Sequence, residues 1–332
     1  MEKSNLRTGV RAYRKGDENQ ITDLFRVSID NPRTVNYWKW ANLKSPFSKS
    51  ISLVAEDCDK NIVGHYAVMV FSLIYKDKSF KAGFGAQLVI HPRFRNFKLM
   101  WELLNNVWSI SKENGLSFIY AFPNNNIWPL KNKMMGWQLI KEFNALELAL
   151  KHVKLNYKEI SEIKFQRVDN LSRYKDVFNN VWSKNSDKYK NLIHIERTYD
   201  FVNWRFFRHP LEHYPFYLVK DGSESIIGWV ALKFYRKSGL LYGHIIDYNI
   251  IGEGLDSVLI RHAVSYFSKN RVDVVSAWCN SAARGAYNDI GFVEKGFSTN
   301  FGIKPLDEDL DNLNEIFNYN RWDMAMSYSD AF

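Results

Sequence analysis

The sequence is poor in the residues that build disulfide or metal frameworks. Only Cys58 and Cys279 are present in 332 residues, which is too few for a disulfide framework, and they lack the paired spacing of a zinc site. The eight histidines form no HExxH motif or comparable cluster. We therefore expect no metal, and a reducing compartment that we take to be the cytoplasm.

Long apolar runs and long basic runs are missing as well. No apolar stretch reaches the length that spans a bilayer, and the amino-terminal segment lacks the apolar region of a signal peptide. The formal charge is +9, but basic residues alternate with aromatic and acidic ones instead of forming a nucleic-acid-binding arm. We expect a small-molecule, phosphate-bearing partner, and neither nucleic acid nor membrane.

What the sequence does contain is enough apolar surface for more than one domain. Hydrophobic residues make up 46% and aromatic residues 16% of the chain, which excludes intrinsic disorder. A length of 332 residues exceeds the usual size of one domain. Two domains, or two halves that share a core, are the expected organisation.

Two triplets of aromatic, basic and aromatic residues mark equivalent places in the two halves. One triplet lies at 38–40 and the other at 204–206. Each is followed within a few residues by a proline, Pro46 or Pro210. These matches are the first sign of an internal duplication.

The segments after these prolines also correspond. Two β-rich runs separated by a turn are predicted at 51–71 and again at 216–235. Near the end of each half, Gly136 or Gly291 follows a helix-like segment and precedes another apolar run. The order of predicted elements is therefore the same in both halves.

This order predicts the fold class. Each half runs strand, helix, helix, three strands, helix, strand, helix, strand, which is an α/β (α+β) arrangement around a mixed sheet. We place the join between the halves at 150–162 and predict domains at 1–155 and 156–332.

The order, with the residues on it, resembles the GNAT acyltransferases over nearly the whole chain, taken as two copies. Three segments of the first copy carry the resemblance: RAYRKGDENQITDLF, VIHPRFRNFKLMWELL and PNNNIWPLKNKMMGW. It implies two tandem GNAT-like acyl-CoA N-acyltransferase folds packed as a pseudo-dimer, and hence a monomeric chain. It also implies acetyl-CoA or a short hydroxyacyl-CoA as co-substrate.

The second of these segments is the acyl-CoA site that the resemblance implies. A strand that leads into a helix amino terminus presents free N–H groups and a positive dipole end to a diphosphate. The family's turn reads Gln/Arg-x-x-Gly-x-Gly/Ala, whereas Lys98 and Met100 replace both small residues here. The implied cofactor-binding residues are Leu88, Val89, Ile90, Arg93, Arg95, Asn96, Phe97, Lys98, Leu99, Met100 and Asn124. A solvated basic turn is the alternative for HPRFRNFK, and a helix cap is the alternative for Asn124.

The second copy differs at the corresponding turn. The segment IIDYNIIGEGLDSVLIRHAV places Glu253 and Asp256 where cations would help, and acidic residues repel a diphosphate. We infer one coenzyme site per chain, in the amino-terminal copy. The carboxy-terminal copy is then expected to help form the acceptor site.

The usual catalytic residues of the family are absent from the first copy. Phe84 stands where a carboxylate often serves as base, and Asn132 stands where a tyrosine often protonates the thiolate. The other titratable candidates are His65, His244, Asp247 and Tyr287.

Two of these candidates lie on one predicted strand. Alternation places His244 and Asp247 on opposite faces unless a bulge intervenes. An aspartate inside an apolar strand is costly without a partner, which makes Asp247 the stronger functional candidate. A salt bridge is the structural alternative for Asp247, and a core position is the alternative for Tyr287.

The Trp-rich segments YWKWANLKSP and VNWRFFRHP resemble N-acyltransferases of nucleotide-linked amino sugars in bacterial surface-glycan (O-antigen or polysaccharide) pathways. The implied acceptor is a dTDP- or UDP-linked amino-deoxy sugar, and its implied binding residues are Trp38, Trp40, Arg205 and Arg208. Core positions are the alternative for the tryptophans. Another small amine, such as an aminoglycoside or aminoacyl substrate, and a non-catalytic ligand-binding protein are the alternative functions.

Overall fold

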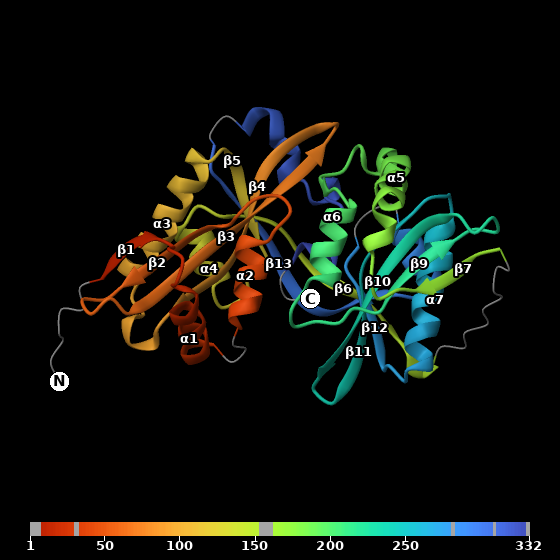
Figure 1. Ribbon diagram of the computed structural model, residues 1–332, viewed down its shortest axis with the longest axis horizontal. Coiled ribbons are helices and arrows are strands. Elements are labelled where there is room, and N and C mark those ends of the chain that lie inside the picture. The colour runs from red at the N-terminus through yellow and green to blue at the C-terminus, as the bar shows by residue number, and fades with distance from the viewer. Residues whose placement is uncertain (1–7, 30–32, 153–161, 280–282, 308–309, 330–332) are drawn as a thin grey trace.

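The computed structural model describes residues 8–29, 33–152, 162–279, 283–307 and 310–329 (Figure 1). Its first half has the predicted order of elements. They are β1 (Gly9–Ala12), α1 (Glu18–Ser28), α2 (Val35–Leu43), β2 (Ile51–Glu56), β3 (Ile62–Tyr75), β4 (Lys78–Ile90), α3 (Phe97–Glu113), β5 (Leu116–Ala121), α4 (Trp128–Met134) and β6 (Gln138–Ala149).

The second half repeats this order with one short extra strand, β8. Its elements are β7 (Lys164–Arg167), α5 (Lys175–Asn185), β8 (His194–Ile195), α6 (Tyr199–Val202), β9 (Phe216–Lys220), β10 (Ile226–Lys237), β11 (Leu240–Ile250), α7 (Leu255–Lys269), β12 (Val274–Ala277), α8 (Arg284–Ile290) and β13 (Val293–Pro305). Helix α6 continues directly into a π-helical turn at Asn203–Phe207. The described residues after β13 form short 3-10 turns, the last at Met326–Tyr328.

Strands from both halves share one continuous sheet. Their order is β1-β2-β3-β4-β5-β13-β6-β12-β11-β10-β9-β7, and β8 pairs with β3 outside this path. The hairpins β2–β3 and β9–β10 are antiparallel, whereas β4–β5 and β11–β12 are parallel. The predicted α/β class with a mixed sheet is confirmed.

The two halves exchange their last strands at the centre of this sheet. Strand β13 of the second half pairs with β5 and β6, and β6 of the first half pairs with β12. The sequence pattern did not predict this exchange, because it depends on pairing between distant segments. The predicted join at 155 lies outside the described residues.

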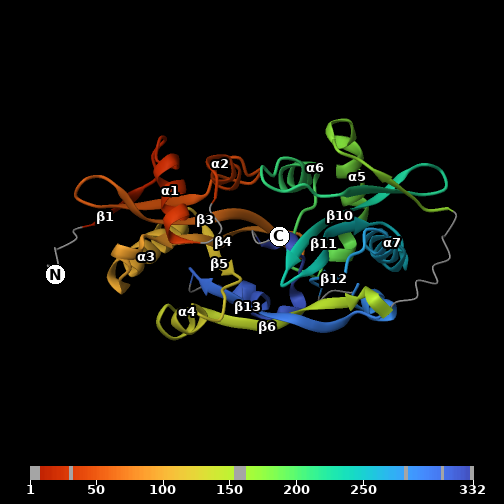
Figure 2. The same cartoon turned by 90° about the horizontal axis from the view of Figure 1, so that it is seen from below.

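Helices of the two halves line one face of the molecule. Figure 2 shows α1, α2, α6 and α5 in a row along this face, with β6 and β13 on the opposite side.

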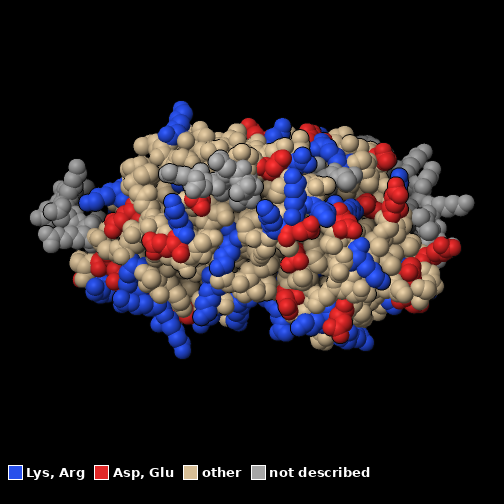
Figure 3. All heavy atoms as spheres, turned by 90° about the horizontal axis from the view of Figure 1, so that it is seen from above, with Lys and Arg blue, Asp and Glu red and all other residues tan. Residues whose placement is uncertain are grey.

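No helix in the described ranges combines the length and the apolar character needed to cross a membrane. On the face shown in Figure 3, acidic side chains are interspersed with Lys and Arg.

A pair of tryptophans joins α2 to the turn after α6. The rings of Trp40 and Trp204 stack with centroids 4.7 Å apart and an interplanar angle of 13°. Each indole Nε1–H donates to the other residue's backbone carbonyl, at 2.9 and 3.2 Å. Because the contact is reciprocal, it has the geometry of an isologous interface and lies on the pseudo-two-fold axis between the halves.

This pair corrects the alignment of the two triplets. The sequence pattern aligned Trp38 with Trp204, but the reciprocal partner of Trp204 is Trp40. The separation of the reciprocal pair is 164 residues, and the same separation relates Pro46 to Pro210. Matching by pattern aligned the first triplet two residues out of register, because either of its tryptophans could be matched to Trp204.

We predict that Trp40→Ala lowers the free energy of unfolding by about 3–5 kcal/mol, the usual cost of truncating a buried aromatic residue. Urea denaturation measures this change. Leu211→Ala, at an exposed position, is the control and should change stability little. The double variant Trp40→Ala/Trp204→Ala should lose less than the sum of the single variants, because each single change already removes the stacking of the two rings. Additive losses would contradict the proposed coupling.

Candidate functional site

Strands β4 and β5 diverge partway along their length. They pair in parallel from Lys81 and Leu116 up to Phe84 and Tyr120, where the pairing ends. Beyond that point, residues 85–90 of β4 pair only with β3 among the described residues. The opposite edge of this stretch therefore carries backbone donors and acceptors that belong to no strand ladder.

A bulge in β4 lies within this unpaired stretch. The register between β3 and β4 shifts between the pairs Ala67–Ala86 and His65–Val89. Gln87, inside the bulge, has a φ of 62°, which is uncommon for a residue other than glycine. Its side-chain Oε1 accepts a hydrogen bond from Asn42 on α2 at 3.0 Å. A bulge of this kind bends its strand locally, just beyond the last residue of β4 that pairs with β5.

The unpaired stretch leads into the amino terminus of α3. Asn96 is the N-cap residue, and its side chain accepts a hydrogen bond from the Leu99 N–H at 2.9 Å. The other N–H groups of the first turn have no acceptor within the helix. Lys98 is exposed on this turn, while Met100 packs against the core beneath it. The predicted strand–turn–helix arrangement is present, and its use as a diphosphate site stays a prediction.

Arg95 connects this turn to its neighbours. Its Nε–H donates to the Ile90 carbonyl at 3.1 Å, and its Nη2 donates to the Ser28 carbonyl at the end of α1 at 2.8 Å. These bonds hold the turn in place. Arg93 and Lys98 are exposed and form no ion pair within the described residues, so they remain the cations available to an anion at this turn.

Asn124 lies just beyond β5. Its Oδ1 accepts hydrogen bonds from the N–H groups of Asn126 and Ile127, at 3.1 and 3.2 Å. These bonds close the turn ahead of α4, whose own N-cap residue is Ile127. A role in cofactor binding stays a prediction.

Aromatic side chains surround the end of the β4–β5 pairing and extend into the second half. The ring of Phe84 lies 5.3 Å from that of Tyr120 and 6.2 Å from that of Phe122. Phe122 in turn lies 4.9 Å from Trp278, which follows β12. The point where the strands diverge is therefore walled by apolar rings.

The carboxy-terminal turns pass over the same region. The Tyr120 hydroxyl donates to the Tyr328 carbonyl at 3.5 Å, and the Ser327 hydroxyl donates to Asp247 Oδ2 at 2.6 Å. Buried Arg205 donates to the carbonyls of Ser327 and Ser329, at 3.3 and 3.1 Å. Arg205, a predicted substrate-binding residue, thus fastens this segment instead of facing solvent.

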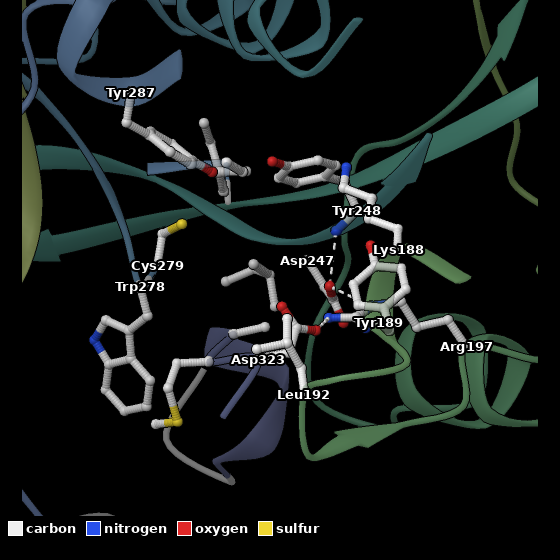
Figure 4. Close-up of a pocket in the computed structure, with 15 residues that line it drawn as sticks. Lys188, Tyr189, Leu192, Arg197, Asp247, Tyr248, Trp278, Cys279, Tyr287 and Asp323 are labelled. Carbon is white, nitrogen blue, oxygen red and sulfur yellow. Dashed lines mark hydrogen bonds and ion pairs between the residues drawn. The ribbon is translucent and has the colours of Figure 1, made fainter. Parts of the chain in front are cut away.

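The second half has its own point of divergence. Strands β11 and β12 pair up to Ile245 and Ala277 and then separate. A narrow cavity of about 40 Å³, lined by both polar and apolar side chains, lies there (Figure 4). Figure 4 shows Asp247, Arg197 and Asp323 meeting at its base, and Trp278 and Tyr287 at its wall. Two predicted candidates, Asp247 and Tyr287, therefore line one cavity.

A buried ion network fills the base of this cavity. Arg197 Nε lies 2.9 Å from Asp247, and its Nη2 lies 2.6 Å from Asp323. Burial raises the pKa of Asp247, an effect that the positive charge of Arg197 opposes. Burial also acts to lower the pKa of Arg197, but the two carboxylates outweigh it and hold that pKa above its usual range. The sequence offered no motif for Arg197 or Asp323, because both lie outside the repeated segments.

Acidic charge stands at the amino terminus of α7, as predicted from the sequence. Asp256 accepts hydrogen bonds from Lys188 Nζ at 2.8 Å and from the Tyr248 hydroxyl at 3.0 Å. The helix end that corresponds to the coenzyme turn of the first half is thus already occupied by side chains of the chain itself.

His244 and Asp247 lie on the same face of β11. The register between β10 and β11 shifts so that Asp247 opposes Ala231 while Ile245 opposes Leu232, which leaves Ile246 as the extra residue. Strict alternation would place the two residues on opposite faces, and this bulge brings them to the same face. His244 nevertheless has a different partner, the Ser276 hydroxyl at 2.6 Å, and does not line the cavity.

His65 is engaged through both ring nitrogens. Its Nε2 accepts a hydrogen bond from the Trp38 indole at 3.1 Å, and its Nδ1 lies 2.9 Å from the Leu53 carbonyl. Both His65 and Trp38 are fully buried. The ring is therefore the neutral Nδ1–H tautomer, and it holds α2 against the sheet.

Trp40 and Arg208 line a groove of about 710 Å³ at the pseudo-two-fold axis. Most of its lining residues form pairs separated by 164 positions: Asn36 and Asp200, Trp40 and Trp204, Lys44 and Arg208, Pro46 and Pro210. The rings of Phe71 and Tyr120 lie between Trp204 and the end of the β4–β5 pairing. The groove and the point of divergence are therefore separated by packed aromatic side chains.

Comparison with known proteins identifies the first half. Residues 9–139 match the family model described as acetyltransferase (GNAT) domain. No curated protein matches the chain. The GNAT domain confirms the prediction of an acyl-CoA-dependent N-acyltransferase.

Solved structures resemble the whole chain in fold. A probable N-acyltransferase of unknown function from Enterococcus faecalis is 10% identical, with a TM-score of 0.69 over 90% of this chain and 73% of that one. A GCN5-related N-acetyltransferase from Anabaena variabilis is 12% identical, with a TM-score of 0.66 over 91% and 73%. Saccharomyces cerevisiae N-myristoyltransferase with bound myristoyl-CoA is 12% identical, with a TM-score of 0.60 over 89% and 82%. These likenesses confirm the predicted two-lobed, GNAT-like fold.

We predict that acid destabilises the protein through its buried histidines. Burial lowers the pKa of both His65 and His244 to about 4. The unfolded chain therefore binds more protons than the folded chain below pH 6.5, and the stability that these neutral rings contribute is lost as the pH falls toward 4.

Urea denaturation at pH 7.5 and pH 5 measures this effect. The free energy of unfolding should be lower at pH 5, and His65→Gln should reduce the difference between the two pH values. His213→Gln, which removes an exposed histidine, is the matched control and should leave the difference unchanged. An undiminished difference in His65→Gln would rule out His65 as a source.

Proposed function

We propose that this N-acyltransferase binds one acyl-CoA where β4 and β5 diverge and transfers the acyl group to the amine of a small molecule. The unpaired edge of residues 85–90, which leads directly to the amino terminus of α3, carries this proposal. Such an edge suits the amide groups of a pantetheine arm, which pair like an added strand. The helix terminus, with exposed Arg93 and Lys98 beside it, suits the diphosphate.

The second half is unsuited to a second acyl-CoA. Its point of divergence holds the Arg197 network, and Asp256 stands at the helix terminus where a diphosphate would lie. We therefore propose a stoichiometry of one coenzyme per chain. We further propose that the protein acts in the cytoplasm and without a metal. We also propose that the chain acts as a monomer, because the pseudo-two-fold contact of a dimer is already made within it.

The chain's own groups suit acyl transfer to a weakly basic amine. Backbone N–H groups on the free edge of β4 can polarise the thioester oxygen as its negative charge develops. Phe84 and Phe122 keep the reacting carbon in apolar surroundings that exclude water. A sugar amine is partly neutral near pH 7, so the absence of a carboxylate at Phe84 does not prevent attack.

Two acceptor chemistries each have an observation in their favour. The groove at the pseudo-two-fold axis presents Lys44 and Arg208, which suit the diphosphate of a dTDP- or UDP-linked amino-deoxy sugar, as in surface-glycan biosynthesis. The cavity beside Trp278, at about 40 Å³, is too small for a whole aminoglycoside, but Asp247 and Asp323 at its base suit one ammonium group of such a cationic amine, in competition with Arg197. Of these two positions, the cavity lies nearer to the point where β4 and β5 diverge, because Trp278 packs directly against Phe122.

Titration calorimetry with acetyl-CoA tests the central proposal. Binding of one equivalent supports the single site, and thiol release with a panel of nucleotide-linked amino sugars and cationic amines identifies the acceptor class. Binding without turnover would retain the coenzyme site and exclude the panel. Lack of binding to acetyl-CoA and to hydroxyacyl-CoA alike would favour a non-catalytic protein.

We predict that Arg93→Ala/Lys98→Ala weakens acetyl-CoA binding about tenfold or more, because two charge-assisted contacts to phosphate are lost. The loss should shrink at high salt, since the contacts are exposed and screened. Lys112→Ala, at the other end of α3, is the matched control and should bind normally. Equal weakening in both variants would contradict a diphosphate site at this turn.

We further predict that the acceptor classes respond to opposite charge changes. Lys44→Ala/Arg208→Ala should raise KM about tenfold for a nucleotide-linked sugar, by loss of diphosphate contacts, and leave KM for a cationic amine unchanged. Asp247→Asn should raise KM about tenfold for a cationic amine and leave KM for a nucleotide-linked sugar unchanged. Steady-state kinetics at saturating acetyl-CoA, with melting temperatures to verify folding, measures both. A KM that neither variant changes would exclude both acceptor positions.

A further inference from the structure

An open recess of about 570 Å³ lies between the end of α3 and the end of β13. Both halves of the chain line it. Trp108 and Lys112 come from α3, Lys304 comes from β13, and Leu306 and Phe317 come from the turns that follow β13. Its volume falls within the range of about 300–1,000 Å³ that is usual for small-molecule sites.

The recess lies on the face of the sheet opposite the apolar rings around the β4–β5 divergence. Ile303 on β13 packs in the same core cluster as Phe84 and Tyr120. The next residue, Lys304, instead contacts Trp108 of the core beneath α3. Successive side chains of a strand point to opposite faces. The recess is therefore separate from the position proposed for the thioester.

Lys304 brings a partly desolvated ammonium group to this recess. Its Nζ lies 4.8 Å from the centroid of the Trp108 ring, and a Cβ at Gly136 would lie 2.9 Å from it. Burial lowers the pKa of Lys304, and no carboxylate opposes this effect. Within the described ranges, Lys304 forms neither an ion pair nor a side-chain hydrogen bond. An ammonium group can only donate, and burying one without an anion is costly, so this position suits an anionic acceptor.

Lys131 on α4 is a second lysine of this kind beside Gly136. Only 7% of its surface is exposed, and its Nζ lies 3.8 Å from the centroid of the Trp137 ring. Burial lowers its pKa to about 7. No carboxylate in the described part of the chain forms an ion pair with Lys131 or Lys304. The positive charge at this end of β13 is thus left for a ligand to offset.

The charge and the walls of the recess select one class of anion. Lys304 and Lys112 line it together with exposed Asp307, which leaves one net positive charge. A single negative charge matches this balance better than a phosphate, whose charge at neutral pH approaches two. Half-buried Leu306 and Phe317 supply an apolar wall beside the lysines.

We propose that this recess binds a small carboxylate that carries an apolar body. The carboxylate pairs with Lys304 and Lys112, and the apolar body lies against Leu306 and Phe317. Pairing restores the counter-charge that Lys304 lacks, and burial of the apolar body adds to the affinity. The inference does not depend on the acyl-CoA site proposed above.

Titration calorimetry with phenylbutyrate and with its uncharged amide, phenylbutyramide, tests the proposal. Phenylbutyrate should bind as one equivalent, and the amide should bind about tenfold more weakly or less, because it cannot pair with an ammonium group. Saturating acetyl-CoA should leave the Kd of phenylbutyrate unchanged. At a pH above the lowered pKa of Lys304, binding should take up protons, because the carboxylate favours the charged lysine.

Two variants locate the carboxylate. Lys304→Met should weaken phenylbutyrate binding about tenfold or more and abolish the proton uptake. Its melting temperature should not fall, since an uncompensated and partly buried charge is removed. Lys112→Glu changes an exposed residue and should also weaken binding. Lys133→Met, at an exposed position on α4, is the matched control and should bind like the wild type.

Several results would overturn the proposal. Equal affinity for the acid and the amide would remove the role of the charge. Competition by acetyl-CoA would place phenylbutyrate in the coenzyme site instead. Undiminished binding in both Lys304→Met and Lys112→Glu, or no binding of any aryl or alkyl carboxylate at millimolar concentration, would exclude a carboxylate site at this recess.

Discussion

The reciprocal contact between Trp40 and Trp204 is the constraint on which the arrangement of the two halves depends. Two indole N–H groups and two carbonyls satisfy one another across the pseudo-two-fold axis, and the stacked rings exclude water from between them. With α2 and the turn after α6 fixed in this way, the aromatic core of the first half continues into that of the second. The exchange of β6 and β13 ties the opposite side of the molecule together.

The same symmetry has different consequences at the two points where parallel strands diverge. In the first half the divergence leaves a free strand edge that leads to a helix terminus beside exposed cations. In the second half the equivalent space is filled by Arg197 between two aspartates. A charged group buried there needs both carboxylates to offset its desolvation, so this half holds a paired ion network where the first half has a free strand edge.

Part of this site was predictable, because it depends on local pattern. The strand, turn and helix around 88–100 follow from residues adjacent in sequence, and so does the acidic turn at Asp256. The partners of the candidate residues were not predictable in this way. His65 bonds to Trp38, and Arg205 bonds to carbonyls more than a hundred positions away. The burial of Lys131 was not predictable either, since an isolated lysine in a short helix has no distinctive pattern.

The sequence by itself determined the duplication, the order of elements and the α/β class, because hydrophobic periodicity and turn residues act over short stretches of chain. Only the tertiary structure decided the register of the repeat, the exchange of the last strands, and which of the two strand divergences stays open. These features depend on long-range pairing and on side-chain packing at the pseudo-two-fold axis. The burial of Trp40 and the bulge that turns Asp247 toward Arg197 are both products of that packing.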